Sequence, residues 1–182
     1  MEEIVKINGK TLKLLKDDIA DMELECLLFY AQHDLKLGSG FGNAITMRGG
    51  PTIQEELNEK GPLQTTEAIL SSAGEMKAKQ IMHAVGPRFL EEDMEGKLRQ
   101  TMTNCLQLAV DRGIKQIAFP AMGVGFYGVP LDMCARVMID TISEYLSRDN
   151  DLSEVLICVL DKREFDPFQA YLATTSSAKE QA

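Results

Sequence analysis

The sequence predicts a single α/β domain, a three-layer α/β/α sandwich with a mixed, largely parallel central sheet. After an opening pair of short strands, apolar segments of strand length alternate with amphipathic helical segments. That alternation is typical of a parallel sheet covered by helices on both faces. The chain of 182 residues suits one domain, and its 45% hydrophobic and 26% charged residues are those of a globular protein.

The first half of the chain predicts a hairpin, three strands and two helices. Apolar and polar residues alternate on both sides of Asn8-Gly9, a dipeptide typical of a type I′ turn, so we expect paired strands at 4–7 and 12–15. A buried strand is expected at 24–28, and a glycine-rich loop at 38–43. A short helix is expected at 44–48, and a helix at 52–60 with Thr52 as its N-cap. Two further strands are expected at 68–72 and 80–85.

The second half predicts two long amphipathic helices and two strands. One helix carries an apolar stripe and is ended by Gly113; the stripe is Met94, Leu98, Met102, Cys105 and Ala109. A strand at 117–119 and a loop at 120–129 lead to the second long helix, with Pro130 in its first turn. The apolar run 155–160 predicts a strand covered on both faces. A short helix at 167–172 closes the domain, which we expect to span 1–173, with a mobile C-terminal tail at 174–182.

The charge balance narrows the partners that we expect. The formal net charge is −9, from 28 acidic and 19 basic residues. This balance opposes binding to duplex nucleic acid, which needs a basic face. It does not oppose a small anion, because a few oriented N–H groups make a local positive site on an acidic protein. No apolar run approaches the ~20 residues that cross a bilayer, so we expect no membrane partner.

The cysteines and histidines predict a reduced protein without a metal centre. The four cysteines, Cys26, Cys105, Cys134 and Cys158, are widely spaced and form no CxxC. We expect them to be buried thiols of a cytoplasmic protein, and residues 1–4 show no feature of a signal peptide. The two histidines lie fifty residues apart and neither pairs with a cysteine at ligand spacing. We therefore expect neither a metal ion nor a cofactor.

Two glycine-rich loops predict a site for a phosphate-bearing ligand. The first is GSGFGN at 38–43, and the second is GVGFYG at 123–128, between a strand and a helix. Glycines let the backbone turn several N–H groups toward one point, and a helix N-terminus adds positive charge there. One such loop is commonly a tight turn without a ligand. Two of them at strand ends favour a clamp for a diphosphate.

Two familiar nucleotide motifs do not fit. The second loop matches GxGxxG, but that fingerprint belongs to the first strand–helix turn and requires an acid about 20 residues later. Here the candidate acid, Asp161, lies well beyond that spacing. Neither loop is followed by GK[ST], so the sequence predicts no P-loop and no NTPase chemistry.

Residues 118–130, AFPAMGVGFYGVP, resemble the FPAxxxGxYGxP loop of the macrodomain family, which binds ADP-ribose. The likeness extends from about Leu12 to Leu172. Asp18-Ile19, Ala44-Ile45, Gly49-Gly50 and the HAVGP segment at 83–87 also resemble family positions. The resemblance implies a ligand that is ADP-ribose or a related nucleotide, free or attached to an ADP-ribosylated protein.

The resemblance also implies roles for individual residues. Asp18 would accept the adenine amino group, with the backbone of Ile19 assisting, and Leu160 stands where some members stack an aromatic ring on adenine. The first diphosphate loop would be Gly38, Ser39, Gly40 and Phe41. The second would be Gly123, Val124, Gly125, Phe126 and Tyr127, whose two aromatic rings would wall the distal ribose.

The chain departs from the family where hydrolytic members act. The family's NAAN becomes Phe29-Tyr30-Ala31-Gln32, and Gly42 replaces an aspartate in the first loop. Gln32 and Asn43 remain as polar side chains near the expected distal ribose. No Ser–His or Cys–His pair is evident. His33 and Asp34 form a residual acid–base candidate, with an exposed loop pair as the alternative interpretation.

Three functions therefore stay open, with binding favoured. The first is a module that binds ADP-ribose or ADP-ribosylated protein. The second is an enzyme acting at the distal ribose, an ADP-ribosyl hydrolase or an ADP-ribose-1″-phosphate phosphatase. The third is an interaction protein that keeps the fold and has lost the ligand.

Overall fold

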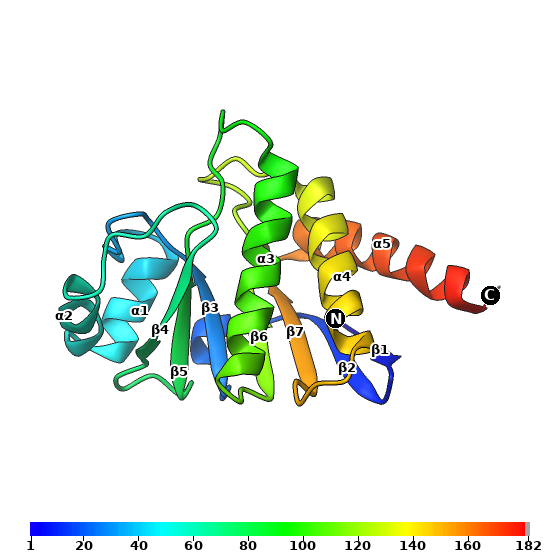
Figure 1. The fold of residues 1–182 in the computed structure, drawn as a ribbon, viewed down its shortest axis with the longest axis horizontal. Helices are drawn as coiled ribbons and strands as arrows, with labels where there is room; N and C mark the ends of the chain where they lie inside the picture. The colour runs from blue at the N-terminus through cyan, green and yellow to red at the C-terminus, as the bar shows by residue number, and fades with distance from the viewer. Residues whose placement is uncertain (181–182) are drawn as a thin grey trace.

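The structure, a computed structural model, describes residues 1–180 and their side chains through residue 175. Its seven strands form one sheet in the order β1-β2-β7-β6-β3-β5-β4 (Figure 1). Four neighbouring pairs of strands are parallel, and only the pairs at the two edges are antiparallel. The predicted mixed, largely parallel sheet is therefore confirmed.

The strands and helices alternate along the chain after the opening hairpin. The strands are β1 (Glu2–Ile7), β2 (Lys10–Lys16), β3 (Cys26–Tyr30), β4 (Ala68–Ser72), β5 (Gln80–Ala84), β6 (Gln116–Phe119) and β7 (Glu154–Val159). The helices are η1 (Ile19–Asp21, 3₁₀), α1 (Phe41–Gly49), α2 (Thr52–Asn58), α3 (Met94–Asp111), α4 (Leu131–Ser147) and α5 (Lys162–Glu180).

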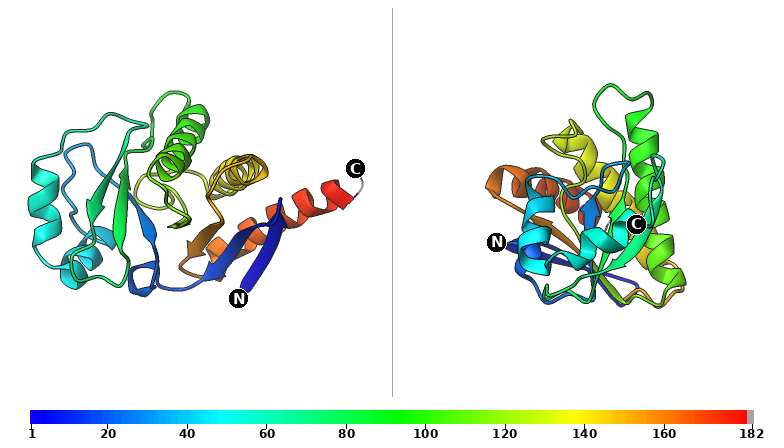
Figure 2. Two further views of the ribbon diagram at one scale, coloured as in Figure 1. Left: turned by 60° about the horizontal axis from the view of Figure 1, so that its bottom comes forward. Right: turned by 90° about the vertical axis from the view of Figure 1, so that its left-hand side faces the viewer.

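The sheet separates two hydrophobic cores, which makes the molecule three-layered (Figure 2). Successive side chains of a strand point to opposite faces, and β3 divides accordingly. Leu28 and Tyr30 join the core under α3, α4 and α5, whereas Leu27 and Phe29 join the core under α1 and α2. The predicted α/β/α sandwich is confirmed.

The opening hairpin has the predicted turn. Asn8 and Gly9 both have positive φ, 52° and 77°, as a type I′ turn requires. The register pairs Ile7 with Lys10 across the turn. The hairpin thus adds β1 to the edge of the sheet beside β2.

Two helix starts differ from the predictions. Helix α1 begins at Phe41, so the last three residues of the predicted loop 38–43 are helical. Helix α2 has Pro51 rather than Thr52 as its N-cap, and no side chain caps it; it ends at Asn58 instead of residue 60. Proline has a fixed φ that suits a helix start, which explains why the chain turns into α2 at Pro51.

The C-terminal helix is longer than predicted. Helix α5 begins at Lys162, where Asp161 accepts a hydrogen bond from the backbone N–H of Glu164 (3.0 Å). Phe165 and Phe168 are buried, at the spacing of one helix face. The helix continues through Glu180, across most of the segment predicted to be a tail; residues 181–182 lie outside the described residues.

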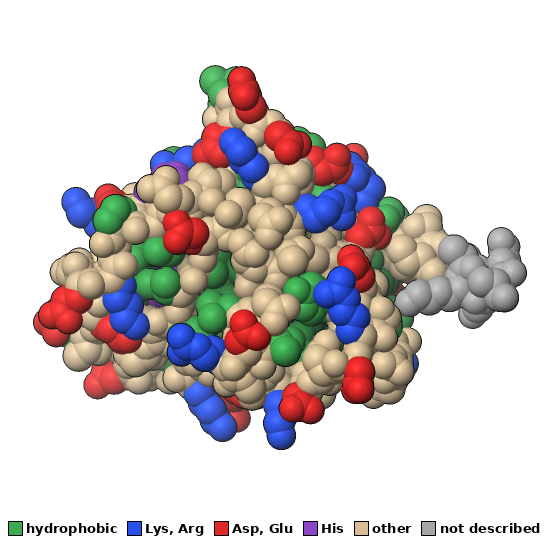
Figure 3. Space-filling model, in the orientation of Figure 1, with side chains coloured by type: hydrophobic (Ala, Val, Ile, Leu, Met, Phe, Trp, Pro, Cys, Tyr) green, Lys and Arg blue, Asp and Glu red, His purple; other side chains and the backbone are tan. Residues whose placement is uncertain are grey.

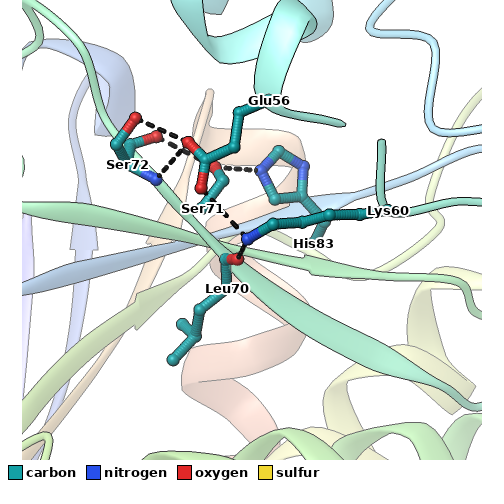
Figure 4. A network of polar contacts seen from close by, with 6 residues as sticks. All are labelled: Glu56, Lys60, Leu70, Ser71, Ser72 and His83. Atoms are coloured by element: carbon teal, nitrogen blue, oxygen red, sulfur yellow. Dashed lines mark hydrogen bonds and ion pairs between the residues drawn. The ribbon is translucent and has the colours of Figure 1, made fainter. Parts of the chain in front are cut away.

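The outer edge of β4 is covered by a side chain of α2, Glu56, and by Lys60, which follows that helix (Figure 4). Glu56 accepts hydrogen bonds from the backbone N–H (3.0 Å) and hydroxyl (2.8 Å) of Ser72, and Lys60 donates to the carbonyl of Leu70 (2.8 Å). These contacts replace the partners that a further strand would supply, and so they block pairing with another chain.

Acidic and basic side chains are interspersed over the face shown in Figure 3. Among the helices of residues 1–180, none combines the length and the apolar character needed to span a membrane.

Candidate functional site

The order of the strands gathers the predicted ligand residues at one end of the sheet, along the line of the carboxyl ends of its parallel strands. The carboxyl ends of the parallel strands β2, β7, β6, β3 and β5 lie at the same edge, in that order. Asp18 follows β2, Leu160 follows β7, the second glycine loop follows β6, and Gln32 follows β3. In an open α/β sheet this edge is where ligands bind.

The second glycine loop presents unused backbone donors. Its shape is set by hydrogen bonds from Gly128 N–H to Gly125 O and from Val129 N–H to Gly123 O, both 3.0 Å. No described residue accepts a hydrogen bond from the N–H groups of Gly125, Phe126 or Tyr127. Gly125 has a φ of 85°, which favours glycine, and a side chain added there would enter open space. The loop therefore offers N–H groups to an anion.

The first loop ends at the N-terminus of α1. Gly40 is the N-cap and provides no side-chain cap, so the first N–H groups of the helix keep no partner within the described chain. The N–H groups of Gly38 and Ser39 are also unused. The helix dipole adds positive potential at the same place. Both predicted phosphate loops thus have the donors that a diphosphate requires.

Gly42 is buried in the first turn of α1 rather than open to a ligand. A Cβ atom at this position would lie 1.7 Å from the carbonyl oxygen of Leu37. Packing therefore requires glycine at this position. Gly42 stays a predicted ligand residue, and it could contribute only its backbone N–H, which has no acceptor among the described residues.

Phe41 packs instead of standing free in the loop. Its ring meets that of Phe29 edge-to-face at 5.5 Å, and Phe29 meets His83 in the same way at 5.8 Å. These edge-to-face contacts anchor the start of α1 to β3 and β5. The backbone of Phe41, rather than its ring, is available to a phosphate.

Asp18 follows β2, and two contacts hold its carboxylate in place. One carboxylate oxygen accepts a hydrogen bond from the backbone N–H of Ala20 (3.1 Å), and the other pairs with the guanidinium of Arg48 (2.8 Å). The hydrogen bond from Arg48 holds the pKa of Asp18 below its usual value. The carboxylate is thus ionised and an acceptor only. Ile19, whose side chain is buried, begins η1 beside it.

Leu160 lies close to Asp18 because β2 and β7 are neighbours. Asp17 donates a hydrogen bond from its backbone N–H to the carbonyl of Val159 (3.2 Å), which ties the two strand ends together. Leu160 follows directly and is 73% exposed. An exposed leucine next to an ionised carboxylate offers an apolar surface for a base.

Beyond the end of β6, toward β3 and β5, several residues contact Tyr127. Its ring lies 4.8 Å from that of Tyr30, and the Arg88 guanidinium lies 5.7 Å from its centroid. Tyr30 donates a hydrogen bond from its hydroxyl to the carbonyl of Pro87, and Phe89 N–H donates to Tyr127 O (2.8 Å). The loops after β5 and β6 therefore lie side by side, at the top of Figure 1.

Tyr30 and Arg88 contact Tyr127 and are thus two further candidate site residues, absent from those that the sequence predicts. Tyr30 was noted only as a departure from NAAN, and Arg88 directly follows the HAVGP segment. The Nε atom of Arg88 is buried and has no hydrogen-bond partner among the described residues. The signal available in the sequence was weak, because neither residue type is specific for this position. Phe126, by contrast, is 92% exposed at the loop surface.

The four catalytic candidates are spread over the β3–α1 segment. Gln32 lies against the first loop, with its Nε2 atom 2.9 Å from where a Cβ of Gly38 would be. His33 contacts the carbonyl of Leu63 through Nδ1 (2.8 Å), and Asp34 accepts the backbone N–H of Lys36 (3.0 Å). Asn43 is exposed on α1. The contacts of His33 and Asp34 are those of loop-shaping residues.

A Ser–His pair does exist, contrary to the sequence analysis, but it is buried. The Ser71 hydroxyl lies 2.7 Å from His83 Nε2 and 2.9 Å from the carbonyl oxygen of Ser72, to which it donates (Figure 4). The two residues are diagonal neighbours on β4 and β5. Burial lowers the pKa of His83 to about 4. The pair has no access to a substrate and serves packing.

The cysteines are not placed to act as nucleophiles. The four cysteines are free and buried, and burial raises the pKa of each thiol. They therefore lack the thiolate character of a nucleophile. Among the side chains that the structure describes, no three of His, Cys, Asp or Glu are grouped so as to hold a metal ion.

Comparison with known proteins places this architecture in a family. Residues 31–138 match the family model for the macro domain. An uncharacterized protein of Saccharolobus solfataricus is 36% identical over 166 residues, which covers 89% of this chain and 92% of that protein. A protein of Enterobacter sp. named O-acetyl-ADP-ribose deacetylase is 32% identical over 167 residues, covering 88% of this chain and 93% of its own length.

Solved structures of macrodomains have the same fold as this chain. A macrodomain of Oceanobacillus iheyensis with ADP superposes with a TM-score of 0.93 at 24% identity, covering 98% of both chains. A variant of that macrodomain with ADPR gives a TM-score of 0.92 at 25% identity, over 97% of this chain and all of the other. The chain belongs to the macrodomain family.

Proposed function

We propose that this protein binds ADP-ribose, free or attached to a protein, across the edge formed by the strand ends. The observation that carries this proposal is the pair of glycine loops in which several backbone N–H groups, among them those of Gly38, Ser39 and Gly125 to Tyr127, have no acceptor among the described residues. Oriented N–H groups of this kind suit an anion, and a diphosphate supplies several acceptor oxygens. The relatives support the same ligand, since one structure holds ADPR and another ADP.

In this proposal the ligand follows the order of the strands. Asp18 and Leu160, at the ends of β2 and β7, would receive adenine, with the ionised carboxylate accepting from the amino group. The two loops would hold the diphosphate. The distal ribose would then reach the ends of β3 and β5, beside Gln32 and Tyr127.

Calorimetric titration tests this proposal. We expect ADP-ribose to bind with micromolar affinity, a free energy of about −8 kcal/mol, and ADP to bind more tightly than AMP. The second expectation follows because AMP lacks the second phosphate that the two loops would share. Absence of heat with all three nucleotides would contradict the proposal and favour a protein that has lost the ligand.

A second candidate function is hydrolysis at the distal ribose. It is favoured by the relative named O-acetyl-ADP-ribose deacetylase. Two observations oppose hydrolysis. No described carboxylate or imidazole makes a hydrogen bond to the side chain of Gln32, and the position of Gly42 has no room for a side chain. We therefore expect weak or no cleavage of ADP-ribosyl esters, and the same for ADP-ribose-1″-phosphate.

A single-turnover assay separates the two candidates. The substrates are O-acetyl-ADP-ribose and a protein carrying ADP-ribose on glutamate, and the products are separated by chromatography. The informative variant is Gln32→Asn, because it restores the family residue without disturbing the glycine packing. Fast turnover by the wild type that survives mutation of Gln32, His33 and Asp34 would establish an enzyme with an unrecognised catalytic group.

We further propose a cytoplasmic protein whose partner is a nucleotide or an ADP-ribosylated protein. Four free, buried thiols support a reducing compartment. The net charge of −9 opposes a duplex nucleic acid as partner. Fractionation of cells, with blotting for this chain, tests the location.

A further inference from the structure

We propose that Arg48 is a positioning residue for base recognition, which holds the Asp18 carboxylate in the orientation that accepts an adenine amino group. The inference rests on the proposed ADP-ribose site. It adds a determinant of base specificity that lies on a different element from Asp18.

The geometry at Asp18 leaves room for a ligand donor. Ala20 N–H donates to one carboxylate oxygen at 3.1 Å and Arg48 Nη2 donates to the other at 2.8 Å. Each carboxylate oxygen accepts about two hydrogen bonds, so one acceptor position on each oxygen remains. The two bonds fix the plane of the carboxylate, and with it the direction of those remaining positions.

Arg48 lies on α1, the helix whose N-terminus follows directly on the first glycine loop. Helix α1 has Gly40 as its N-cap and Arg48 in its last turn, and it contacts η1, which Asp18 caps. Ile45 and Gly49 bury one face of the helix. Nine residues of helix span roughly 13 Å. A rigid element thus joins the start of the diphosphate site to the base-reading carboxylate.

The ion pair between Arg48 and Asp18 is expected to contribute little to the free energy of unfolding. The side chains of Arg48 and Asp18 are 41% and 53% exposed, and exposed pairs contribute little to folding because water screens them. The pair does act on the carboxylate itself, since it lowers the pKa of Asp18. Orientation of an acceptor, rather than folding, is the role that fits a half-exposed pair at this place.

The test compares ADP with inosine diphosphate, which carries an oxygen where adenine carries the amino group. We expect the wild type to prefer ADP, and Arg48→Met to reduce that preference about threefold or more while the thermal midpoint changes little. Arg48→Lys should restore most of the preference, because it retains a donor. In an Asp18→Ala background, Arg48→Met should have no further effect, since Arg48 acts through Asp18.

Lys77→Met is the matched control. Lys77 pairs with Asp21 at 3.1 Å on the same 3₁₀ helix, and both partners are more than half exposed. Its loss should leave the preference for ADP unchanged. An equal effect of Lys77→Met would assign the effect to general charge and overturn the inference.

Other outcomes also decide. Tighter ADP binding by Arg48→Met would mean that Arg48 competes with adenine, and an equal loss for both nucleotides would place Arg48 at the phosphates; either overturns the inference. If the wild type binds neither ADP nor ADP-ribose, the proposed function fails instead. In that case NMR titration can still measure the effect of Arg48 on the carboxyl pKa of Asp18 without any ligand. A pKa that is the same in the wild type and in Arg48→Met would overturn the positioning role.

Discussion

At the scale of single residues, Asp18 and His83 show how the surroundings set a side chain's protonation. Asp18 is exposed and kept ionised by Arg48, whereas His83 is buried and kept neutral by desolvation. The first arrangement suits recognition of a ligand donor. The second suits packing between two strands.

Replacing Asp18 with alanine should weaken ADP-ribose binding by roughly 1–3 kcal/mol, the usual loss when a charged hydrogen bond is removed. Calorimetry measures the change, and comparison with the guanine analogue measures base selectivity. Asp21→Ala, which removes the other acidic side chain of the same 3₁₀ turn, should bind normally. An Asp18→Ala variant that still prefers the adenine ligand would remove Asp18 from the site.

The neutral state of His83 should make folding stability depend on pH. Its pKa is about 4 in the folded protein and 6.5 in an unfolded chain, so the unfolded chain binds the proton more readily. The stabilising contribution is complete above pH 6.5 and is lost as the pH falls toward 4. Between pH 7 and pH 5, where most carboxylates stay ionised, the loss should be about 2 kcal/mol.

Urea unfolding of His83→Phe at the two pH values tests this expectation. The variant should lose most of the difference between pH 7 and pH 5, whereas His33→Gln should retain it. Ser71 keeps its bond to the Ser72 carbonyl in the variant, so no new unpaired hydroxyl is created. A wild-type stability that is flat over this range would show that His83 titrates normally.

At the scale of elements, the second glycine loop is the part that a ligand would use most directly. Its three glycines at 123, 125 and 128 all have positive φ, and its N–H groups between Gly125 and Tyr127 are unused by the described chain. Tyr30 supports the loop from below through its ring contact with Tyr127. The loop is thus held in shape without a ligand.

Gly125→Glu should abolish ADP-ribose binding, because the side chain would fill the space that a phosphate needs and its charge would repel the phosphate. Gly113→Glu is the matched control. Gly113 also has positive φ, at 68°, with open space around its Cβ position, but it follows α3 and precedes β6, at the opposite end of that strand from the second glycine loop. Both variants therefore carry similar backbone strain, and only the first should lose binding in calorimetry.

At the scale of the whole molecule, a ligand that bridges several strand ends should stabilise the entire fold. Binding to the native state alone adds RT ln(1 + [L]/Kd), about 4 kcal/mol at a ligand concentration a thousand times Kd. Millimolar ADP-ribose should therefore raise the thermal midpoint by several degrees, as measured by differential scanning fluorimetry. Gly125→Glu should show no such rise, and an unmoved wild-type midpoint would contradict ADP-ribose binding.

The sequence by itself determined the layer architecture and the position of the two glycine loops at strand ends. Hydrophobic periodicity is a local property, so β4 was predicted at its observed bounds and the stripe of α3 was assigned correctly. The turn at Asn8-Gly9 is local for the same reason. Glycine loops at strand ends are also read from adjacent residues. These features need no knowledge of what lies across the sheet.

Only the tertiary structure decided how distant residues meet. Arg48 pairs with Asp18 across thirty positions, Tyr30 supports a loop nearly a hundred residues later, and Gly42 is required because Leu37 folds back onto it. The start of α5 before residue 167 likewise brings Phe165 into the core beside Phe168, a burial that depends on the other helices packed there. Contacts of this kind depend on the path of the whole chain, because the energy that selects them comes from packing and desolvation between elements, which no local pattern encodes.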